Sequence, residues 1–352
     1  MKRAGVYIHI PFCRTRCSYC DFATGAYEGA LAAASVRAVS AEIKSFRQPE
    51  EPAKEVDTIY FGGGTPSLLS PAQVEQILEA VHTRFSVAAG AEVTMEMNPG
   101  TVTPEVLREF RGLGVNRASF GAQTFDDEEL RRLGRTHTAE DVRRTIDYLR
   151  EAGFDNTSFD LIAGLPAQTL EAWQRNLDEA LKLRPEHLSF YLLEVHEGTP
   201  LAAQIKRGQQ PMPDEDVAAQ MYRRMLDTAA EAGYEHYEIS NLCLPGYESR
   251  HNSKYWTSEA VYGFGCSAHS HDGKRTRWSN ERDAARYVEL IEAKGDAVIE
   301  TEELNEQNVR GEAVFLGLRL MRGVDLREYR SRFGVDLREE YATDLERLSE
   351  AG

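Results

Sequence analysis

The 352-residue sequence has only five cysteines, an odd number without the paired spacings of a disulfide framework. It also lacks an apolar run long enough to span a bilayer. Its 41 basic residues are outnumbered by 57 acidic ones, and the net charge of −16 disfavours a nucleic-acid partner because phosphates would be repelled. The first five residues lead directly into an apolar segment, so we expect no signal peptide. These absences predict a cytoplasmic protein without a transmembrane segment, whose thiols are free or bind metal. A peripheral membrane contact and a homodimer are both compatible with them.

The first 200 residues alternate between short apolar strands and amphipathic helices. Strands are predicted at 6–10, 58–61, 92–97, 117–120, 158–162 and 188–193, and helices at 31–46, from 71 onward, 104–113, 139–152 and 170–183. Each strand except the last is followed by a helix, which indicates a parallel sheet with right-handed crossovers. Six such units are too few for a closed eight-stranded barrel.

The pattern changes after residue 200. Helices are predicted at 214–232, 284–294, 312–322 and 337–349, and a strand at 234–239. The stretch 241–272 is dominated by aromatic, glycine and histidine residues and shows no clear period. We therefore expect a second, smaller and mainly helical part of the chain.

Three cysteines lie within eight residues, at positions Cys13, Cys17 and Cys20. Three thiolates leave one coordination position of a metal centre open, because a saturated site usually has four protein ligands. The alternative is a zinc knot in which His9 supplies the fourth ligand. Pro11 and the aromatic flanks favour a loop that leaves a strand over such a knot.

Polar side chains follow several of the predicted strands at their carboxyl ends. Gly63 and its neighbours would let the backbone approach a ligand closely and offer unpaired N–H groups, although such a run is often only a turn. Glu96, Gln123 and Asp160 end three successive strands, and Arg135 follows twelve residues after Gln123. Each has a structural alternative as a hydrogen-bonding, capping or surface residue. Together they suit a zwitterionic nucleoside, which needs carboxylate, amide and guanidinium partners.

These motifs carry a resemblance to a known family. The C-x3-C-x2-C spacing resembles the radical S-adenosylmethionine (SAM) superfamily, and the block from Tyr60 to Ser67 resembles its coproporphyrinogen III oxidase-like family. The segment His251-Asn-Ser-Lys-Tyr-Trp256 fits the HNxxYW motif of the heme-chaperone branch of that family. Phe22 stands where the true coproporphyrinogen oxidases have a fourth cysteine. The resemblance covers nearly the whole chain.

The resemblance implies an α/β fold, an open (βα)6 partial TIM barrel of the radical SAM type with a smaller, mainly helical C-terminal domain. It divides the chain into a barrel over 1–200, an extension with the HNxxYW motif over 201–300, and a winged-helix-like cap over 301–352. Relatives usually continue for another strand pair, so a short C-terminus is expected. It also implies a [4Fe–4S] cluster on the three cysteines. SAM is then expected to bind a set of strand-end residues: Tyr7, Tyr19, Gly63, Gly64, Thr65, Glu96, Gln123, Arg135 and Asp160.

The HNxxYW segment is the predicted heme site. His251 and Tyr255 lie at i and i+4 and would share one face of a helix, while Trp256 could stack on a porphyrin. Arg250 and Lys254 would supply cations for the heme propionates. The alternative is that these side chains are ordinary packing between domains.

Cys266 is an alternative heme ligand, although a small buried residue in a glycine-rich turn is the simpler interpretation. Two functions follow from the resemblance. The first is a chaperone that binds heme and delivers it to apoproteins, without an assigned catalytic residue. The second is an oxygen-independent coproporphyrinogen III oxidase, which decarboxylates its substrate to protoporphyrinogen IX. Phe22 and the HNxxYW segment favour the first.

Overall fold

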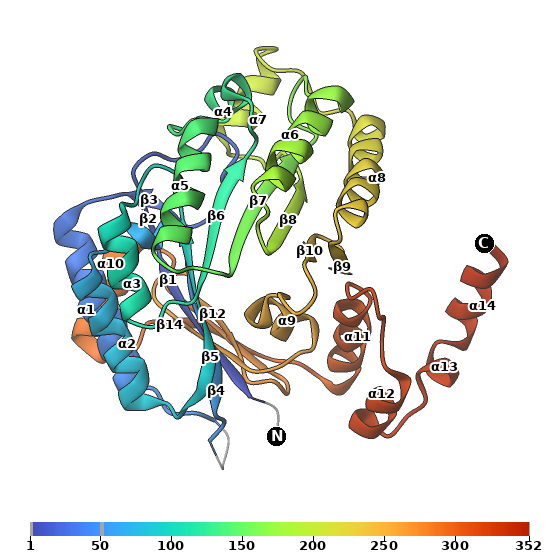
Figure 1. Cartoon of the computed structure of the whole chain (residues 1–352). Coiled ribbons are helices and arrows are strands. Elements are labelled where there is room, and N and C mark those ends of the chain that lie inside the picture. The colour runs from blue at the N-terminus through green and yellow to red at the C-terminus, as the bar shows by residue number, and fades with distance from the viewer. Residues whose placement is uncertain (1–2, 50–52, 352) are drawn as a thin grey trace.

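In a computed structural model that describes residues 3–49 and 53–351, twelve strands form one continuous sheet, and a further pair of strands stands apart. The centre of the sheet holds six parallel strands whose order in space follows their order in the chain (Figure 1). They are β1 (Ala4–Ile10), β4 (Val56–Gly63), β5 (Val87–Met97), β6 (Arg117–Gln123), β7 (Thr157–Ala163) and β8 (His187–Leu192). The predicted partial barrel of six βα units is therefore confirmed.

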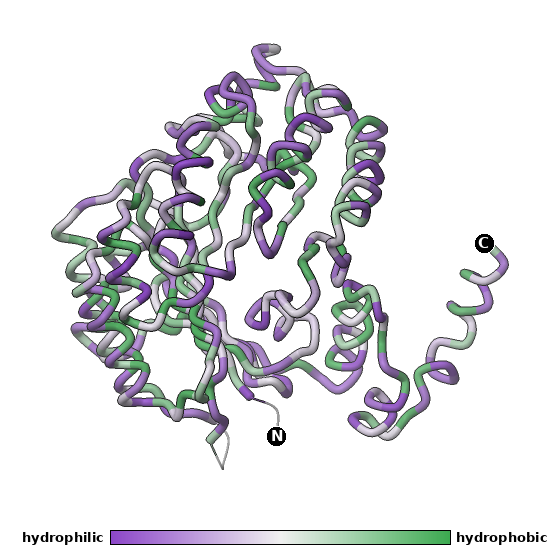
Figure 2. The backbone as a smooth tube through the Cα atoms, in the orientation of Figure 1, coloured by the Kyte–Doolittle hydropathy of each residue, from purple (hydrophilic) through white to green (hydrophobic). Residues whose placement is uncertain are grey.

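Helices connect these strands and cover the outer face of the sheet (Figure 1). They are α1 (Gly29–Ser45), α2 (Pro71–Arg84), α3 (Pro104–Gly112), α4 (Asp127–Arg132), α5 (Ala139–Glu151), α6 (Leu170–Lys182) and α7 (Pro200–Lys206), with a 3-10 turn at Pro66–Leu68. Capping boxes fix the starts of α2 and α5. The side chains of Ser70 and Thr138 accept from the amides of Gln73 and Asp141, and the cap amides donate to the side chains of these two residues. Hydrophobic and hydrophilic residues alternate along the helices, as expected for elements with one buried face (Figure 2).

Short strands extend the sheet at both edges. Beside β1 lie β11 (Val261–Phe264), which is parallel to it, and then β12 (His269–His271), β13 (Thr276–Asn280) and β14 (Val298–Glu303), which are antiparallel. Beside β8 lie β10 (Asn241–Cys243) and β9 (Glu235–Glu238). The sequence predicts only the last of these six, because the others do not show a two-residue alternation of apolar and polar side chains.

The remaining helices are α8 (Glu215–Glu231), α9 (Arg250–Trp256), α10 (Ala284–Lys294), α11 (Glu306–Gly317), α12 (Leu326–Phe333), α13 (Leu337–Glu340) and α14 (Ala342–Ala351). The predicted helix at 312–322 begins earlier, at Glu306, and the predicted helix at 337–349 is interrupted at Tyr341. None of the described side chains of α14 is buried, and this helix projects from the body of the molecule (Figure 1).

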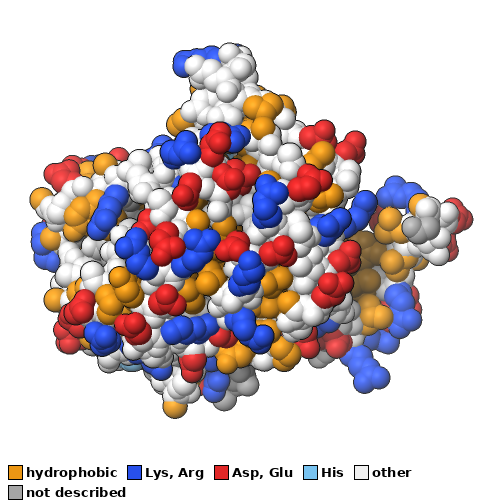
Figure 3. Space-filling view, turned by 45° about the horizontal axis from the view of Figure 1, so that its top comes forward, with side chains coloured by type: hydrophobic (Ala, Val, Ile, Leu, Met, Phe, Trp, Pro, Cys, Tyr) orange, Lys and Arg blue, Asp and Glu red, His pale blue; other side chains and the backbone are white. Residues whose placement is uncertain are grey.

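Acidic and basic side chains are interspersed over the face shown in Figure 3, with small apolar patches between them. Over the described residues, no helix is long and apolar enough to cross a membrane.

Candidate functional site

The three clustered cysteines lie on a loop between β1 and α1. The two-stranded pair β2 (Phe12–Cys13) and β3 (Gly25–Ala26) closes the base of this loop. Ser18 holds its middle, because its amide donates to the Leu133 carbonyl (2.9 Å) and its carbonyl accepts from the Leu201 amide (2.8 Å). The loop is thus braced against the ends of α4 and α7, on the side of the sheet where the parallel strands end.

The three thiols line one wall of a cavity of about 430 Å³. Each has a possible hydrogen-bond donor within the protein: Arg135 Nη1 lies 3.3 Å from Cys17 Sγ, Thr65 Oγ1 3.6 Å from Cys13 Sγ, and Thr24 Oγ1 4.0 Å from Cys20 Sγ. Donors to sulfur stabilise a thiolate, which is the form that binds iron. The volume is in the range of small-molecule sites. The residues therefore fit a cluster with an open side toward a bound ligand.

The zinc alternative does not fit this arrangement. Both ring nitrogens of His9 have other partners, Tyr7 OH at 3.0 Å from Nδ1 and the Ala23 carbonyl at 3.1 Å from Nε2. Nor do any three His, Cys, Asp or Glu side chains of the described chain converge as a single metal ion requires. A four-iron cluster binds each thiolate through a different iron atom, so its ligands lie farther apart than those of one ion.

Two glycines of the Gly-rich segment are required by close contacts. Gly63 has φ +109°, and a Cβ there would lie 2.6 Å from the His9 ring. At Gly64 a Cβ would lie 2.7 Å from the Phe12 carbonyl oxygen. A side chain at Gly63 would therefore collide with His9 of β1, and one at Gly64 would push the start of the cysteine loop away from the sheet.

The predicted unpaired N–H groups of this segment are not found. Gly64 and Thr65 both donate to backbone carbonyls of the β1–β2 segment at 2.8 Å, and Gly63 donates to Glu96 Oε2 at 3.0 Å. That expectation was wrong because the amides fasten the segment to the cysteine loop and to β5. The segment therefore contributes a backbone that lies close to the cysteine loop, and not free N–H donors.

Two carboxylates line the cavity with the cysteines, Glu96 near the end of β5 and Asp160 from β7. Asp160 does not end its strand as expected but lies at its middle, three residues before Ala163. Glu96 accepts from Tyr60 OH at 2.8 Å, and burial raises its pKa to about 7, with the Asp160 charge adding to the rise. Burial also raises the pKa of Asp160, against the lowering effects of Ser189 and Arg117. Carboxyl groups whose pKa is raised by burial in a cavity are suited to a cationic ligand, which would favour their ionised form.

A chain of hydrogen bonds connects the guanidinium of Arg135 to the Gly-rich segment. Arg135 Nη2 donates to Asn98 Oδ1 at 2.9 Å and to the Gly121 carbonyl at 2.6 Å, and Asn98 Nδ2 donates to Thr65 Oγ1 at 2.7 Å. Nearby, Gln123 has φ +64° where the β6–β7 register shifts. Such strained positions are frequent at ligand sites.

Most of the residues predicted for the nucleoside share the cysteine cavity. These are Tyr19, Gly63, Gly64, Glu96, Gln123, Arg135 and Asp160. Tyr7 and Thr65 do not line it: Tyr7 contacts His9 below the cavity, and Thr65 lies behind Cys13. Sequence reasoning missed several lining residues, Met97, Asn98, Ser119, Tyr191, Glu194 and His196. Asn98 could have been found from its place two residues after Glu96, whereas the loop after β8 has no local signal.

The HNxxYW segment forms the short helix α9, so the predicted i, i+4 pairing is confirmed. His251 Nε2 lies 3.3 Å from Tyr255 OH, and Nδ1 lies 2.9 Å from Thr58 Oγ1. The imidazole stacks on Tyr60 at 5.0 Å between centroids and is 1% exposed. Burial lowers its pKa to about 3, with the Lys254 charge as the next cause. In this conformation His251 is a neutral, fully bonded core residue without access to a ligand.

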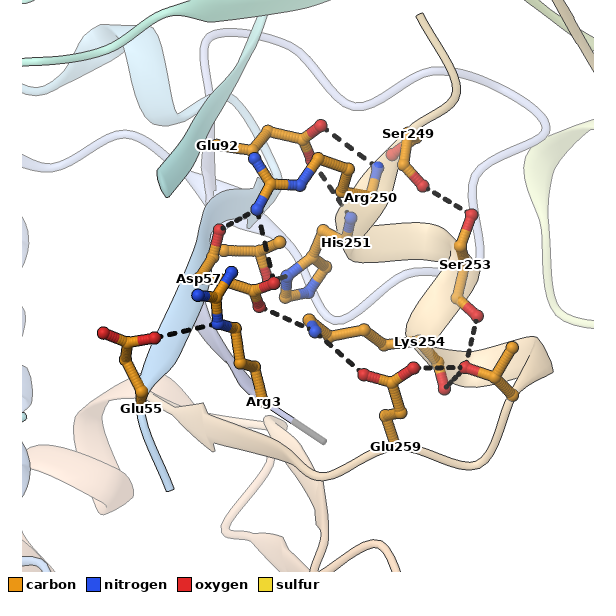
Figure 4. Close-up of polar contacts among 12 residues, drawn as sticks. Arg3, Glu55, Asp57, Glu92, Ser249, Arg250, His251, Ser253, Lys254 and Glu259 are labelled. Atoms are coloured by element: carbon orange, nitrogen blue, oxygen red, sulfur yellow. Dashed lines mark hydrogen bonds and ion pairs between the residues drawn. The ribbon is translucent and has the colours of Figure 1, made fainter. Parts of the chain in front are cut away.

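The two cations beside His251 are also paired inside the protein. Lys254 Nζ lies 2.7 Å from Asp57 Oδ1 and 3.1 Å from Glu259 Oε2, and Arg250 reaches the other Asp57 oxygen at 3.3 Å (Figure 4). Glu92 of β5 accepts the amides of Arg250 and His251, each at 3.0 Å. The expectation that these cations bind heme propionates is not met in this conformation, because neighbouring strands neutralise them.

Trp256 lies farther from the cavity. The Arg319 guanidinium covers its ring at 4.1 Å, and the ring borders a small cleft toward α11 and α12. Cys266, the alternative ligand, is 2% exposed in its turn. The structure therefore does not bring any of His251, Tyr255, Trp256 or Cys266 to the cysteine cavity. His251 and Cys266 are buried core residues, whereas Tyr255 is 39% exposed.

Comparison with family profiles defines the class of proteins to which a chain with this six-unit barrel and three-thiol loop is similar. The profile of the Radical SAM superfamily matches residues 7–180, and that of the HemN C-terminal domain matches residues 304–352. The structure is also similar to the coproporphyrinogen III oxidase HemN from Escherichia coli, described as a radical SAM enzyme. That similarity has a TM-score of 0.85 and 25% identity, covering 100% of this chain and 84% of the other.

Curated relatives narrow the class. The heme chaperone HemW of Lactococcus lactis is 36% identical over 99% of this chain and 89% of its own length. HemW of Bacillus subtilis is 35% identical over 100% of this chain and 92% of its length, and HemW of Escherichia coli 36% identical over 81% and 75%. The chain belongs to the coproporphyrinogen III oxidase-like family of radical SAM proteins, in its HemW branch.

Proposed function

We propose that this protein is a heme chaperone that binds a [4Fe–4S] cluster, SAM and heme, and delivers heme to apoproteins. The observation that carries the proposal is Phe22 at the cavity. An exposed phenyl ring stands there in place of the fourth cysteine of the coproporphyrinogen oxidases, in a chain similar to HemW proteins over nearly its whole length. The same proposal places the protein in the reducing cytoplasm. It includes heme-accepting apoproteins as partners, and a homodimer.

Cys13, Cys17 and Cys20 would hold the cluster, and SAM bound to such a cluster is a source of one-electron chemistry. This chain's own residues would orient SAM. The Glu96 carboxylate would accept from its amino group, and Asp160 from hydroxyl donors of the nucleoside. Arg135, already 3.3 Å from Cys17 Sγ, would face the carboxylate of SAM.

We also propose the division of the chain into a barrel over 1–200, an extension over 201–300 and a cap over 301–352. Support for the first boundary comes from the change from parallel to antiparallel pairing after β8. The barrel and the extension share one sheet, so we expect them to unfold together. The cap, which is helical, is the part expected to unfold separately.

The competing function is coproporphyrinogen oxidation, which the structural similarity to HemN favours. An assay of heme delivery distinguishes the chaperone function from coproporphyrinogen oxidation. The reconstituted protein is loaded with hemin, freed of excess and mixed with the heme-free form of a heme-requiring enzyme. We expect the Soret band to move to the acceptor and its activity to return. A protein that binds no hemin under these conditions would contradict the proposal.

Replacing Asp160 by Asn tests the SAM site. The change keeps the shape of the side chain but removes its charge, so hydrogen bonds to SAM donors weaken. We expect a loss of about 1.5–3 kcal/mol of SAM binding free energy, while the iron content stays that of the wild type. Isothermal titration calorimetry measures the first and iron analysis the second. Unchanged SAM affinity would remove Asp160 from the site.

SAM affinity should also depend on pH through Glu96. Its pKa of about 7 means that half of the molecules carry a neutral carboxyl at neutral pH, and only the carboxylate pairs with an ammonium group. We expect affinity to rise from about pH 6 to about pH 8, with a limiting slope of about tenfold per pH unit below the pKa. The Glu96→Gln variant should bind SAM more weakly and lose this dependence. A wild-type affinity independent of pH would contradict the assignment.

A further inference from the structure

The helix α9, which carries the HNxxYW segment, and the cysteine cavity are held by the same two strands. Near the start of β4, Thr58 Oγ1 lies 2.9 Å from His251 Nδ1, and Glu92, its neighbour on β5, accepts the His251 amide at 3.0 Å (Figure 4). Farther along the same strands, Gly63 of β4 and Glu96 of β5 line the cysteine cavity. The predicted heme segment and the predicted SAM site therefore share β4 and β5.

One side chain of β4 contacts residues of both sites. The Tyr60 hydroxyl donates to Glu96 Oε1 at 2.8 Å, and the Tyr60 ring stacks on the His251 imidazole at 5.0 Å between centroids, with 29° between the planes. Among the described residues, Tyr60 is the only side chain that hydrogen-bonds to Glu96, whose Oε2 accepts from the Gly63 amide at 3.0 Å. The position of Tyr60 thus affects how Glu96 is held, and His251 affects the position of Tyr60.

The packing around this phenol ring is tight. Tyr7 of β1 stacks on Tyr60 at 6.1 Å between centroids, and its ring centroid lies 6.4 Å from that of His251. A Cβ at Gly62 would lie 2.9 Å from carbon atoms of both phenol rings. Packed interiors change between discrete arrangements and do not deform gradually. A displacement of His251 therefore removes one of the contacts that hold Tyr60 in place.

A heme ligated by α9 would produce such a displacement. Tyr255 is the exposed partner of His251 on this helix, and its hydroxyl lies 3.3 Å from His251 Nε2. Iron bound to either side chain would compete with this contact. Iron bound to the imidazole would also draw it away from the ring of Tyr60, because His251 is 1% exposed in its present position. The hydrogen bond from Tyr60 to Glu96 would then be less well supported.

We propose that Tyr60 is a positioning residue that couples the two sites, so that heme on α9 weakens SAM binding in the cavity. This inference rests on the proposed function and adds the regulation of its two ligand sites. Coupling between two bound ligands is reciprocal, so SAM weakens heme binding by the same factor. A carrier with this coupling releases its heme more readily when SAM is bound.

The ionisation of Glu96 provides a second readout. Burial raises the pKa of Glu96, and the hydrogen bond from Tyr60 opposes that rise, so loss of the bond raises this pKa further. The Asp160 charge of β7 also raises it, and the Arg117 charge of β6 lowers it. Three further phenols lie within the field of Glu96, from β1, β8 and α9: Tyr7, Tyr191 and Tyr255.

Calorimetric titration of SAM into the cluster-reconstituted protein, with and without saturating hemin, tests the coupling. We expect hemin to weaken SAM binding by the wild type about fivefold or more. The Tyr60→Phe variant keeps the ring against His251 but lacks the hydroxyl. It should bind hemin as the wild type does and bind SAM more weakly, and hemin should no longer change its SAM affinity. The midpoint of its pH profile for SAM binding should lie higher by about 0.5–1 pH unit.

Tyr234→Phe is the matched control. Tyr234 is also a buried phenol, but its hydroxyl donates to the Pro185 carbonyl, and it neither lines the cysteine cavity nor belongs to α9. This variant should keep the wild-type SAM affinity, the wild-type pH midpoint and the effect of hemin. A general effect of removing a buried hydroxyl would appear in both variants.

The possible failures can be told apart. Equal SAM affinity with and without hemin, in a wild type that binds both, would overturn the coupling and leave the carrier function intact. A hemin effect that persists in Tyr60→Phe would overturn the assignment to Tyr60. A wild type that binds no hemin would overturn the carrier function together with the coupling. The wild-type comparison needs no variant, so it decides the coupling even if Tyr60→Phe does not fold.

Discussion

The Cys17→Ala variant is expected to lose the iron–sulfur cluster completely. Cys17 lines the cavity with Cys13 and Cys20, and the two remaining cysteines are buried elsewhere, so no further thiol can replace it. After anaerobic reconstitution the wild type should contain about four irons per chain, as a cubane cluster requires. Iron and sulfide analysis, together with the charge-transfer absorption, measures the difference.

Cys243→Ala is the matched control for the loss of a thiol. Cys243 is fully buried on β10 and does not line the cysteine cavity, so this variant should keep the full cluster. A normal cluster in Cys17→Ala would contradict the three-thiol site. One equivalent of zinc in the wild type, instead of iron, would restore the zinc interpretation that the bonding of His9 opposes.

The second large effect is expected on stability, at Asp57. This carboxylate is the closest partner of Lys254, which is 4% exposed and also lies 3.1 Å from Glu259. Removing one partner of a buried ion pair is costly, and here it leaves the ammonium with the more distant Glu259 carboxylate alone. We expect Asp57→Ala to lower the free energy of unfolding by about 3–5 kcal/mol, measured by denaturation with urea.

The neighbouring surface pair between Arg3 and Glu55 supplies the control (Figure 4). Its atoms are 2.8 Å apart, but both side chains are nearly half exposed. Such pairs contribute about 0–1 kcal/mol, so Glu55→Ala should change stability little. Equal effects of Asp57→Ala and Glu55→Ala would mean that the Lys254 ammonium reaches water, and that α9 is not held against β4 as described.

The architecture of the barrel was predictable because each parallel strand is buried on both faces and each crossover helix has a helical apolar period. The added strands β11 to β14 were not, since segments of three to six residues rich in glycine, histidine and charge carry no period. The first of them, β11, joins the sheet through Val261 and its neighbours, which pair with β1 residues more than two hundred positions away.

The cavity was predictable in part for a similar reason. Parallel strands end on one side of a sheet, so Glu96 and Asp160 had to lie near the cysteine loop. The environment of His251 could not be foreseen, because its partner Thr58 is 193 positions away in the sequence. In the sequence the HNxxYW segment has the pattern of a set of heme ligands. In the folded chain it is a helix packed against the first residues of two strands. His196 escaped notice because nothing beside it in the sequence marks a site.

The central claim is that this protein carries heme and does not oxidise coproporphyrinogen. One anaerobic preparation with a reconstituted cluster tests it most directly. Half is incubated with SAM, a reductant and coproporphyrinogen III and assayed for protoporphyrinogen IX, and half is titrated with hemin. We predict no protoporphyrinogen IX and a saturable Soret band. Formation of protoporphyrinogen IX with release of carbon dioxide would contradict the account, whatever the affinity for hemin.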